Sequence, residues 1–234
     1  MIEKSKESSH GFSDQGASVG RSTQAIEESK AIGRYGVECV GPVEEFRARY
    51  VLLRDRIISF KQMGKVRRFL QRANIARTLS EFAAIPTEIK WTEAFDNLVT
   101  TIGKNFMLDT TLSGSGYTAA WYILLIGSTS YTTGAAVTDT MASHGGWAED
   151  VEYSQSARPT TAWSAAAAGS KALSSAAVFS INGDGTTIKG CGLNSVATKS
   201  GTTGTLFSAG LFTGGGKVLA NGDTLNVSYT ATLT

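Results

Sequence analysis

The residues that could carry out chemistry gather in one short stretch, residues 139–159 (DTMASHGGWAEDVEYSQSARP). This stretch holds the side-chain types from which hydrolase and metal sites are built: Ser143, His144, Glu149, Asp150 and Glu152. A Ser143–His144–Asp150 triad is disfavoured, because triads are usually assembled from distant chain positions and adjacent Ser and His side chains seldom point at each other. The chain has two histidines and no G-x-S-x-G nucleophile elbow. We therefore expect no enzyme activity and no catalytic residues.

We interpret this stretch as a corner of the fold. Thr140 can cap a short helical turn, and Gly145 and Gly146 can end that turn. Trp147 is then expected to anchor the next segment in the core.

Other polar and glycine-rich segments give no stronger sign of chemistry. The acids near His144 form a loose cluster without a recognised ligand spacing, so a metal site there is an alternative that we do not favour. Residues 182–185 (NGDG) lack the alternating acids of a calcium loop and are typical of a hairpin turn. Residues 213–217 (TGGGK) lack the spacing of a phosphate-binding loop. We expect no metal ion and no cofactor.

Residues 91–234 have the pattern of an antiparallel β-domain, because turn-forming Gly, Asn and Asp clusters separate short apolar segments rich in Thr and Ser. The last segment alternates most clearly, with Leu225, Val227 and Tyr229 on one face. The expected strands are residues 117–126, 177–181, 187–193, 205–209 and 224–233, with one short helix at residues 102–112. This pattern predicts a β-sandwich or a jelly roll.

Residues 43–90 are predicted to form a long basic amphipathic helix. Large apolar residues step by three and four from Val43 to Phe60, and the stripe continues through Met63, Val66, Leu70 and Ala73. Gly64 is a candidate interruption. At about 1.5 Å per residue the helix would reach roughly 60 Å. Such a helix is too long for a small compact domain, so its apolar face needs a partner.

The same segment is strongly basic, with ten Lys/Arg and one acid, Asp55, between Arg47 and Arg77. Arginine makes bidentate contacts with carboxylates, so docking on an acidic protein surface is favoured over binding of nucleic acid and over a merely solvated face. The residues expected to bind a protein partner combine the stripe with these arginines: Phe46, Tyr50, Arg54, Ile57, Phe60, Arg67, Arg68 and Arg72.

Residues 1–42 are rich in Ser, Gly, Glu and Lys, which predicts a flexible or extended N-terminal arm. Residues 1–90 carry 16 Lys/Arg and 11 Asp/Glu, whereas residues 91–234 carry 6 and 9. No apolar run approaches the ~18 residues of a membrane span, and the start has no apolar signal core. We expect Cys39 and Cys191 to be free thiols.

Much of the β-domain resembles a family of small structural proteins of tailed bacteriophages. The segments that carry the resemblance are residues 103–109, 119–127 (AAWYILLIG), 139–149, 153–159, 171–183, 199–210 and 221–234 (NGDTLNVSYTATLT). The resemblance covers roughly residues 94–234 and is weak over residues 1–90. Members of the family look like capsid decoration (cement) proteins or minor virion proteins. The resemblance implies a virion location after synthesis in the host bacterial cytoplasm, and it supplies no catalytic residues.

The leading hypothesis is a virion protein that decorates and stabilises the capsid lattice. Its arm and helix would dock on the major capsid protein, its β-domain would project, and it would self-associate as a dimer or trimer. The alternative is a head–tail connector or a tail-associated minor virion protein. An internal nucleic-acid-binding virion protein is the least favoured of these, and no membrane partner is expected.

Overall fold

The structure is a computed structural model that describes residues 31–112, 120–127 and 134–233. In these ranges the chain is mainly β, with a ten-stranded antiparallel sheet. Its longer strands are β1 (Ala31–Pro42), β2 (Thr87–Val99), β3 (Tyr122–Gly127), β7 (Thr186–Asn194), β8 (Leu206–Leu211) and β10 (Thr224–Leu233). Its shorter strands are β4 (Ala148–Asp150), β5 (Ser170–Ala172), β6 (Ala177–Ser180) and β9 (Lys217–Leu219).

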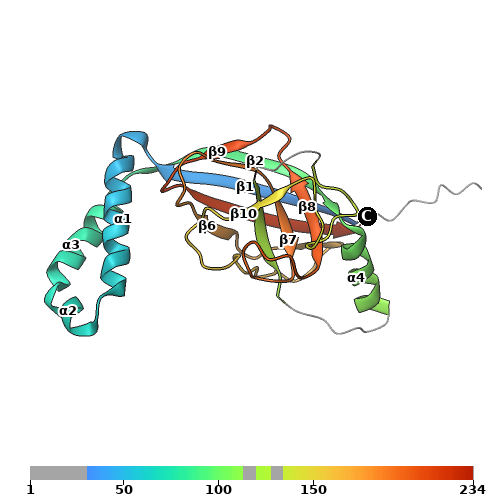
Figure 1. The fold of residues 1–234 in the computed structure, drawn as a ribbon, viewed down its shortest axis with the longest axis horizontal. Coiled ribbons are helices and arrows are strands. Elements are labelled where there is room, and N and C mark those ends of the chain that lie inside the picture. The colour runs from blue at the N-terminus through green and yellow to red at the C-terminus, as the bar shows by residue number, and fades with distance from the viewer. Residues whose placement is uncertain (1–30, 113–119, 128–133, 234) are drawn as a thin grey trace, which may run out of the picture.

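The helices lie at the two ends of the molecule (Figure 1). Between β1 and β2 the chain forms η1 (Glu44–Phe46), α1 (Arg47–Gln62), α2 (Lys65–Leu70) and α3 (Arg72–Ala83). We call residues 43–86 the lobe and the remaining described residues the body. The helix α4 (Thr101–Leu112) lies at the opposite end of the body (Figure 1). No helix in the described ranges is long and apolar enough to cross a membrane.

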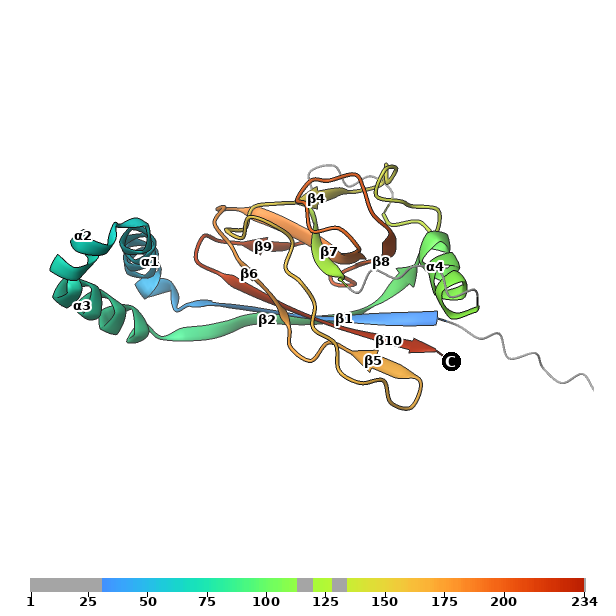
Figure 2. The same cartoon turned by 90° about the horizontal axis from the view of Figure 1, so that it is seen from below.

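The sheet folds over so that its two halves face each other (Figure 2). Its strand order is β4-β3-β7-β8-β2-β1-β10-β5, with β6 paired to β10 and β9 paired to β7. The halves are joined where the end of β2 pairs with β8, through Leu98 opposite Ala209 and Val99 opposite Ser208. One half therefore contains the long strands β1, β2 and β10, and the other contains β3, β7 and β8.

The main core fills the space between the two halves. Tyr35 and Val227 from the first half pack in one cluster with Ile123 and Cys191 from the second. A smaller cluster on the outer face of β3 contains Leu124, Ile126, Met141, Trp147, Leu206 and Ala209. Because β3 is buried on both faces, its sequence is a continuous apolar run instead of an alternating one.

Several predictions of strands are confirmed within a residue or two. The predicted strand at residues 224–233 is β10, and the predicted helix at residues 102–112 is α4. The two cysteines are free and buried. Part of the predicted first strand, residues 117–119, lies outside the described residues.

The prediction of an N-terminal arm over residues 1–42 is wrong for residues 31–42, which form β1 between β2 and β10. Tyr35, Val37 and Cys39 alternate into the core along this strand. Residues 1–30 lie outside the described residues. The β-domain therefore begins before residue 91 and includes β1.

The prediction of one long helix is wrong, whereas the candidate interruption at Gly64 is confirmed. The helix ends at Gln62, Gly64 precedes α2, and α3 runs back beside α1 as a hairpin (Figure 1). Residues 87–90 belong to β2. The backbone N–H of Val43 donates to the carbonyl of Pro86 at 3.1 Å, so the lobe leaves and rejoins the sheet at one narrow neck.

Candidate functional site

Residues 139–159 form a corner of the body, but the expected helical turn after Thr140 is a tight turn in which Thr140 and Ser143 form an isolated antiparallel bridge. Trp147 is buried, and its indole nitrogen donates a 2.8 Å hydrogen bond to Asp139. The His144 ring stacks on Trp147 with 4.0 Å between ring centroids, and its Nδ1 lies 2.9 Å from the carbonyl oxygen of Trp147. Ser143 is exposed, and its backbone N–H donates to Thr140 Oγ1. His144 therefore packs and bonds against Trp147.

The acids of this stretch bind separate partners inside the fold. Glu149 accepts two 2.7 Å hydrogen bonds from Arg158, and both side chains are buried. Glu152 accepts a hydrogen bond from Thr186, and Asp150 accepts one from the backbone N–H of Glu152. Burial raises the pKa of Asp150. Among the described residues, no group of three or more His, Cys, Asp or Glu side chains is arranged to hold a metal ion.

The apolar stripe predicted to bind a partner is covered in part by the lobe itself. The Tyr50 ring lies 4.7 Å from the Phe82 ring of α3, and it also lies beside Gly222 of the body, where an added Cβ would meet the ring at 3.2 Å. Leu53 is 2% exposed. The other stripe residues of the predicted set, Phe46, Ile57 and Phe60, are half-buried. The helix α3 and the body therefore cover much of the apolar surface that was predicted to bind a partner.

Two of the four predicted arginines bond within the chain. Arg54 donates to Asp55 and reaches the carbonyl of Ile181 at 3.4 Å. Arg68 donates to the carbonyls of Lys61 and Met63 at 2.9 Å each, so it closes the C-terminal end of α1. The remaining two are exposed, Arg67 on α2 and Arg72 at the start of α3.

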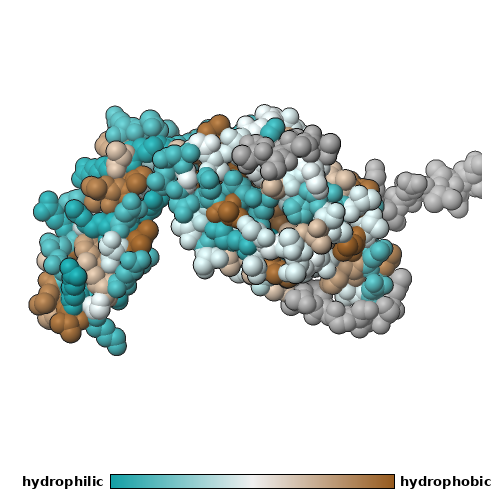
Figure 3. All heavy atoms as spheres, viewed as in Figure 1, coloured by the Kyte–Doolittle hydropathy of each residue, from teal (hydrophilic) through white to brown (hydrophobic). Residues whose placement is uncertain are grey.

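The most exposed apolar residues of the lobe were not among the predicted binding residues. Val66, Phe69 and Leu70, which we call the tip, are 76%, 72% and 75% exposed. They lie on α2 at the far end of the lobe, where apolar side chains gather (Figure 3). Large exposed apolar patches mark interaction sites in soluble proteins. The sequence pattern placed Val66 and Leu70 on the continued stripe, and the break at Gly64 turns them outward.

A polar groove of about 440 Å³ lies between α1 and α3. It is lined by Arg56, Phe60, Gln71, Asn74, Arg77, Thr78 and Glu81. The hydrogen bond from Arg77 lowers the pKa of Glu81, so this carboxylate stays ionised and offsets part of the positive charge. The lobe as a whole carries ten Lys/Arg and four Asp/Glu. Its surface is therefore suited to an acidic partner.

The lobe is held to the body at its base. Arg47, the first residue of α1, donates to the carbonyl of Asn221 at 3.0 Å and to Asp223. Lys90 of β2 lies 2.8 Å from the same carboxylate. These bonds fix the direction in which the lobe projects.

No protein-family model matches the chain, and a search of curated proteins gives no match. Among the described residues, the candidate functional site is the projecting basic lobe with its apolar tip. Its side chains are suited to binding a protein surface.

Proposed function

We propose that this chain is a structural protein of a tailed-phage virion that binds and stabilises the capsid lattice as a decoration (cement) protein. The lobe docks on coat subunits, and the body projects from the shell. The protein is made in the cytoplasm of the host bacterium and acts in the virion without catalysis or a cofactor.

The observation that carries the proposal is the lobe. It projects from one end of the body (Figure 1), and it carries ten Lys/Arg against four Asp/Glu. The groove between α1 and α3 offers Arg56 to a carboxylate of a partner, whereas Arg77 is already paired with Glu81. Repeated on a lattice, many contacts of modest strength give strong attachment through high effective concentration.

The resemblance of residues 94–234 to structural proteins of tailed phages supports the virion location. We propose that the folded-over sheet is a variant of the β-sandwich or jelly roll expected for this region, with β1 added as an interior strand. Because residues 31–42 and 87–90 belong to the sheet, the docking element among the described residues narrows to the lobe.

Two measurements test the proposal. The first is the number of copies in purified virions, where decoration requires a number comparable to that of the coat protein. A copy number far below that of the coat protein would instead favour a connector or a tail-associated role.

The second measurement is binding of the purified chain to capsids built from the coat protein encoded with it. Arg56→Glu places a negative charge in the groove, and we expect about tenfold weaker binding with a reduced salt dependence. Lys104→Glu is the matched control, because Lys104 is exposed on α4 at the other end of the body. Equal binding by the wild type and Arg56→Glu would argue against docking through this groove.

A further inference from the structure

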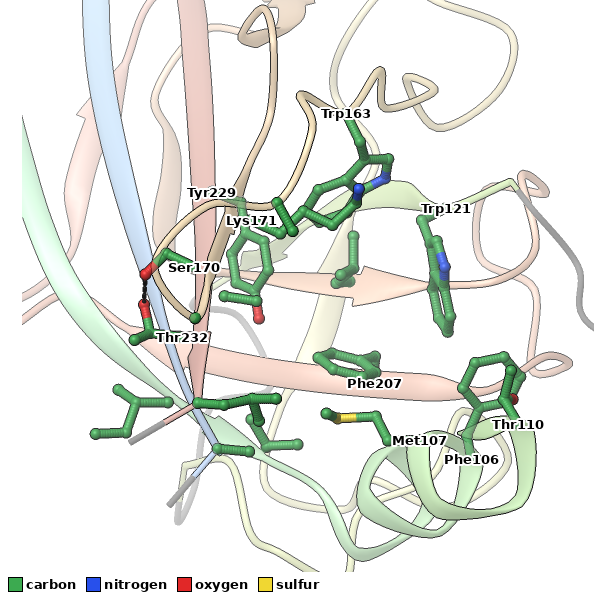
Figure 4. Close-up of a pocket in the computed structure, with 18 residues that line it drawn as sticks. Phe106, Met107, Thr110, Trp121, Trp163, Ser170, Lys171, Phe207, Tyr229 and Thr232 are labelled. Carbon is green, nitrogen blue, oxygen red and sulfur yellow. Dashed lines mark hydrogen bonds between the residues drawn. The ribbon is translucent and has the colours of Figure 1, made fainter. Parts of the chain in front are cut away.

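The body has an aromatic cavity of about 480 Å³ at the end that lies opposite the lobe. Figure 4 shows its walls, which come from α4, β8, β10 and the chain around Trp163. The main lining residues are Phe106, Met107, Trp121, Trp163, Phe207 and Tyr229. The Trp121 ring packs edge-on against Phe207 at 5.5 Å, and the Trp163 ring packs edge-on against Tyr229 at 5.9 Å. These ring contacts hold the walls of the cavity in place without a bound ligand.

The few polar groups of this cavity are mostly engaged. Ser170 and Thr232 bond to each other at 2.9 Å, and Lys171 donates to the carbonyl of Ser164. The indole nitrogen of Trp163 is buried and has no hydrogen-bond partner among the described residues. The hydroxyl of Thr110, which also lines the cavity, has no hydrogen-bond partner among the described residues either. A mostly apolar cavity of this kind suits large apolar side chains.

The tip of the lobe is the matching feature on the same chain. Val66, Phe69 and Leu70 lie on one short helix and are each more than 70% exposed. The tip and the cavity are at opposite ends of the molecule (Figure 1), so a chain cannot fill its own cavity with its own tip.

We propose that the tip of one copy inserts into the aromatic cavity of the next copy, so that copies associate head to tail. The charges favour this arrangement over contact between two tips. Among the residues that line the cavity, Lys171 is the one charged side chain, and it already donates to the carbonyl of Ser164. Two tips in contact would bring together the cations that flank them, Lys65, Arg67, Arg68 and Arg72.

This contact is heterologous, because it joins two different surfaces, so its repetition gives either a closed ring or an open chain of copies. It goes beyond the proposed function, since it is a property of the chain alone. Docking on coat subunits uses the groove between α1 and α3, and the copy-to-copy contact uses the tip. Failure of one therefore leaves the other intact.

The test measures the mass of the full chain in solution by sedimentation velocity over a range of concentrations, without capsids. Phe69→Asp removes the tip, and Ala166→Arg blocks the cavity at an exposed lining position. Each variant alone is expected to stay monomeric while the wild type associates. An equal mixture is expected to form a 1:1 dimer and nothing larger, because the intact tip of one variant fits the intact cavity of the other.

Val218→Asp is the control, since Val218 is 67% exposed on β9 and away from both surfaces, and this variant should associate like the wild type. Thermal unfolding of each variant checks that its substitution leaves the fold intact. A monomeric wild type overturns the proposal. So does association of Ala166→Arg at wild-type strength, which would show that the tip binds another surface or that another segment fills the cavity.

Discussion

Arg47 and Asp223 are joined by two hydrogen bonds, because both terminal guanidinium nitrogens donate to one carboxylate oxygen at 3.2 Å each. Lys90 reaches the same oxygen at 2.8 Å. Arg47 begins the first long helix of the lobe, and Lys90 lies on the strand that returns from it. One buried carboxylate therefore clamps both connections between lobe and body.

Replacing Asp223 with Asn is expected to loosen the lobe, because two partly buried cations lose their anion. We expect the free energy of unfolding to fall by about 1–3 kcal/mol and the amides of α1 to exchange faster than those of β10. Urea unfolding and hydrogen exchange check this. Asp96→Asn, at an exposed position on β2, is the control and should change neither quantity. Unchanged exchange in α1 would show that the clamp does not hold the lobe.

Removing one partner of the Glu149–Arg158 pair is expected to lower the free energy of unfolding strongly. Both side chains are buried, so Glu149→Ala leaves an unpaired buried cation and should lower the free energy of unfolding by about 3–5 kcal/mol. The double variant Glu149→Leu with Arg158→Met should recover much of that loss, which urea unfolding measures. The exposed Arg77–Glu81 pair is the comparison, and Arg77→Gln should lower the free energy of unfolding far less than Glu149→Ala does. A double variant as unstable as Glu149→Ala would contradict this account.

Gly103→Ala tests helix propensity against packing. Ala is the better helix former by about 1 kcal/mol, so propensity alone predicts stabilisation of α4. A Cβ at Gly103 would, however, meet the carbonyl oxygen of Phe207 well inside contact distance. We expect a net loss of about 1–3 kcal/mol in urea unfolding, as for other overpacked sites. Gly64→Ala, where a Cβ meets nothing within 4 Å, should be close to neutral, and a stabilised Gly103→Ala variant would refute the close contact.

The buried thiols should make the fold sensitive to alkaline pH. Burial, with a further contribution from Asp223, raises the pKa of Cys39 to about 12, and burial also raises the pKa of Cys191. In the unfolded chain the pKa of a cysteine thiol is about 8.5. This contribution to stability is therefore complete below that pH and is lost as the pH rises toward 12. Urea unfolding across this range should show falling stability, with a smaller slope for Cys39→Ala.

The same burial should protect both thiols from a thiol-specific reagent near neutral pH. Labelling should become rapid once the chain is unfolded in denaturant. Fast labelling of either cysteine in the native protein would contradict this prediction.

The elements with a strong local pattern could be predicted from the sequence. Residues 224–233 alternate between two faces and form β10, and the corner around Trp147 follows from its glycines and its single large anchor. These features depend on neighbouring residues, which a sequence shows directly.

What could not be predicted depends on distant partners. Tyr35, Val37 and Cys39 alternate along residues 31–42, which is a local strand pattern, but the place of this strand in the sheet depends on pairing with β10 and β2. Likewise, the apolar stripe of α1 does not reveal that α3 will cover it, nor that Gly64 turns Phe69 outward. The predicted binding residues therefore lie on the segment that forms the lobe, but several of them face α3 or the body.

The pairing of β1 with β10 also has a consequence for the order in which the protein folds. These strands match over Ala31–Val40 and Thr224–Leu233, about 190 residues apart. Contacts of such long range are slow to form, whereas a helical hairpin forms from contacts close in sequence. The lobe can thus fold while the chain is still being synthesised, but β1 must wait for β10 to emerge from the ribosome. During that interval the apolar side of β1 is open to other chains, so the yield of native protein depends on how soon β10 is synthesised.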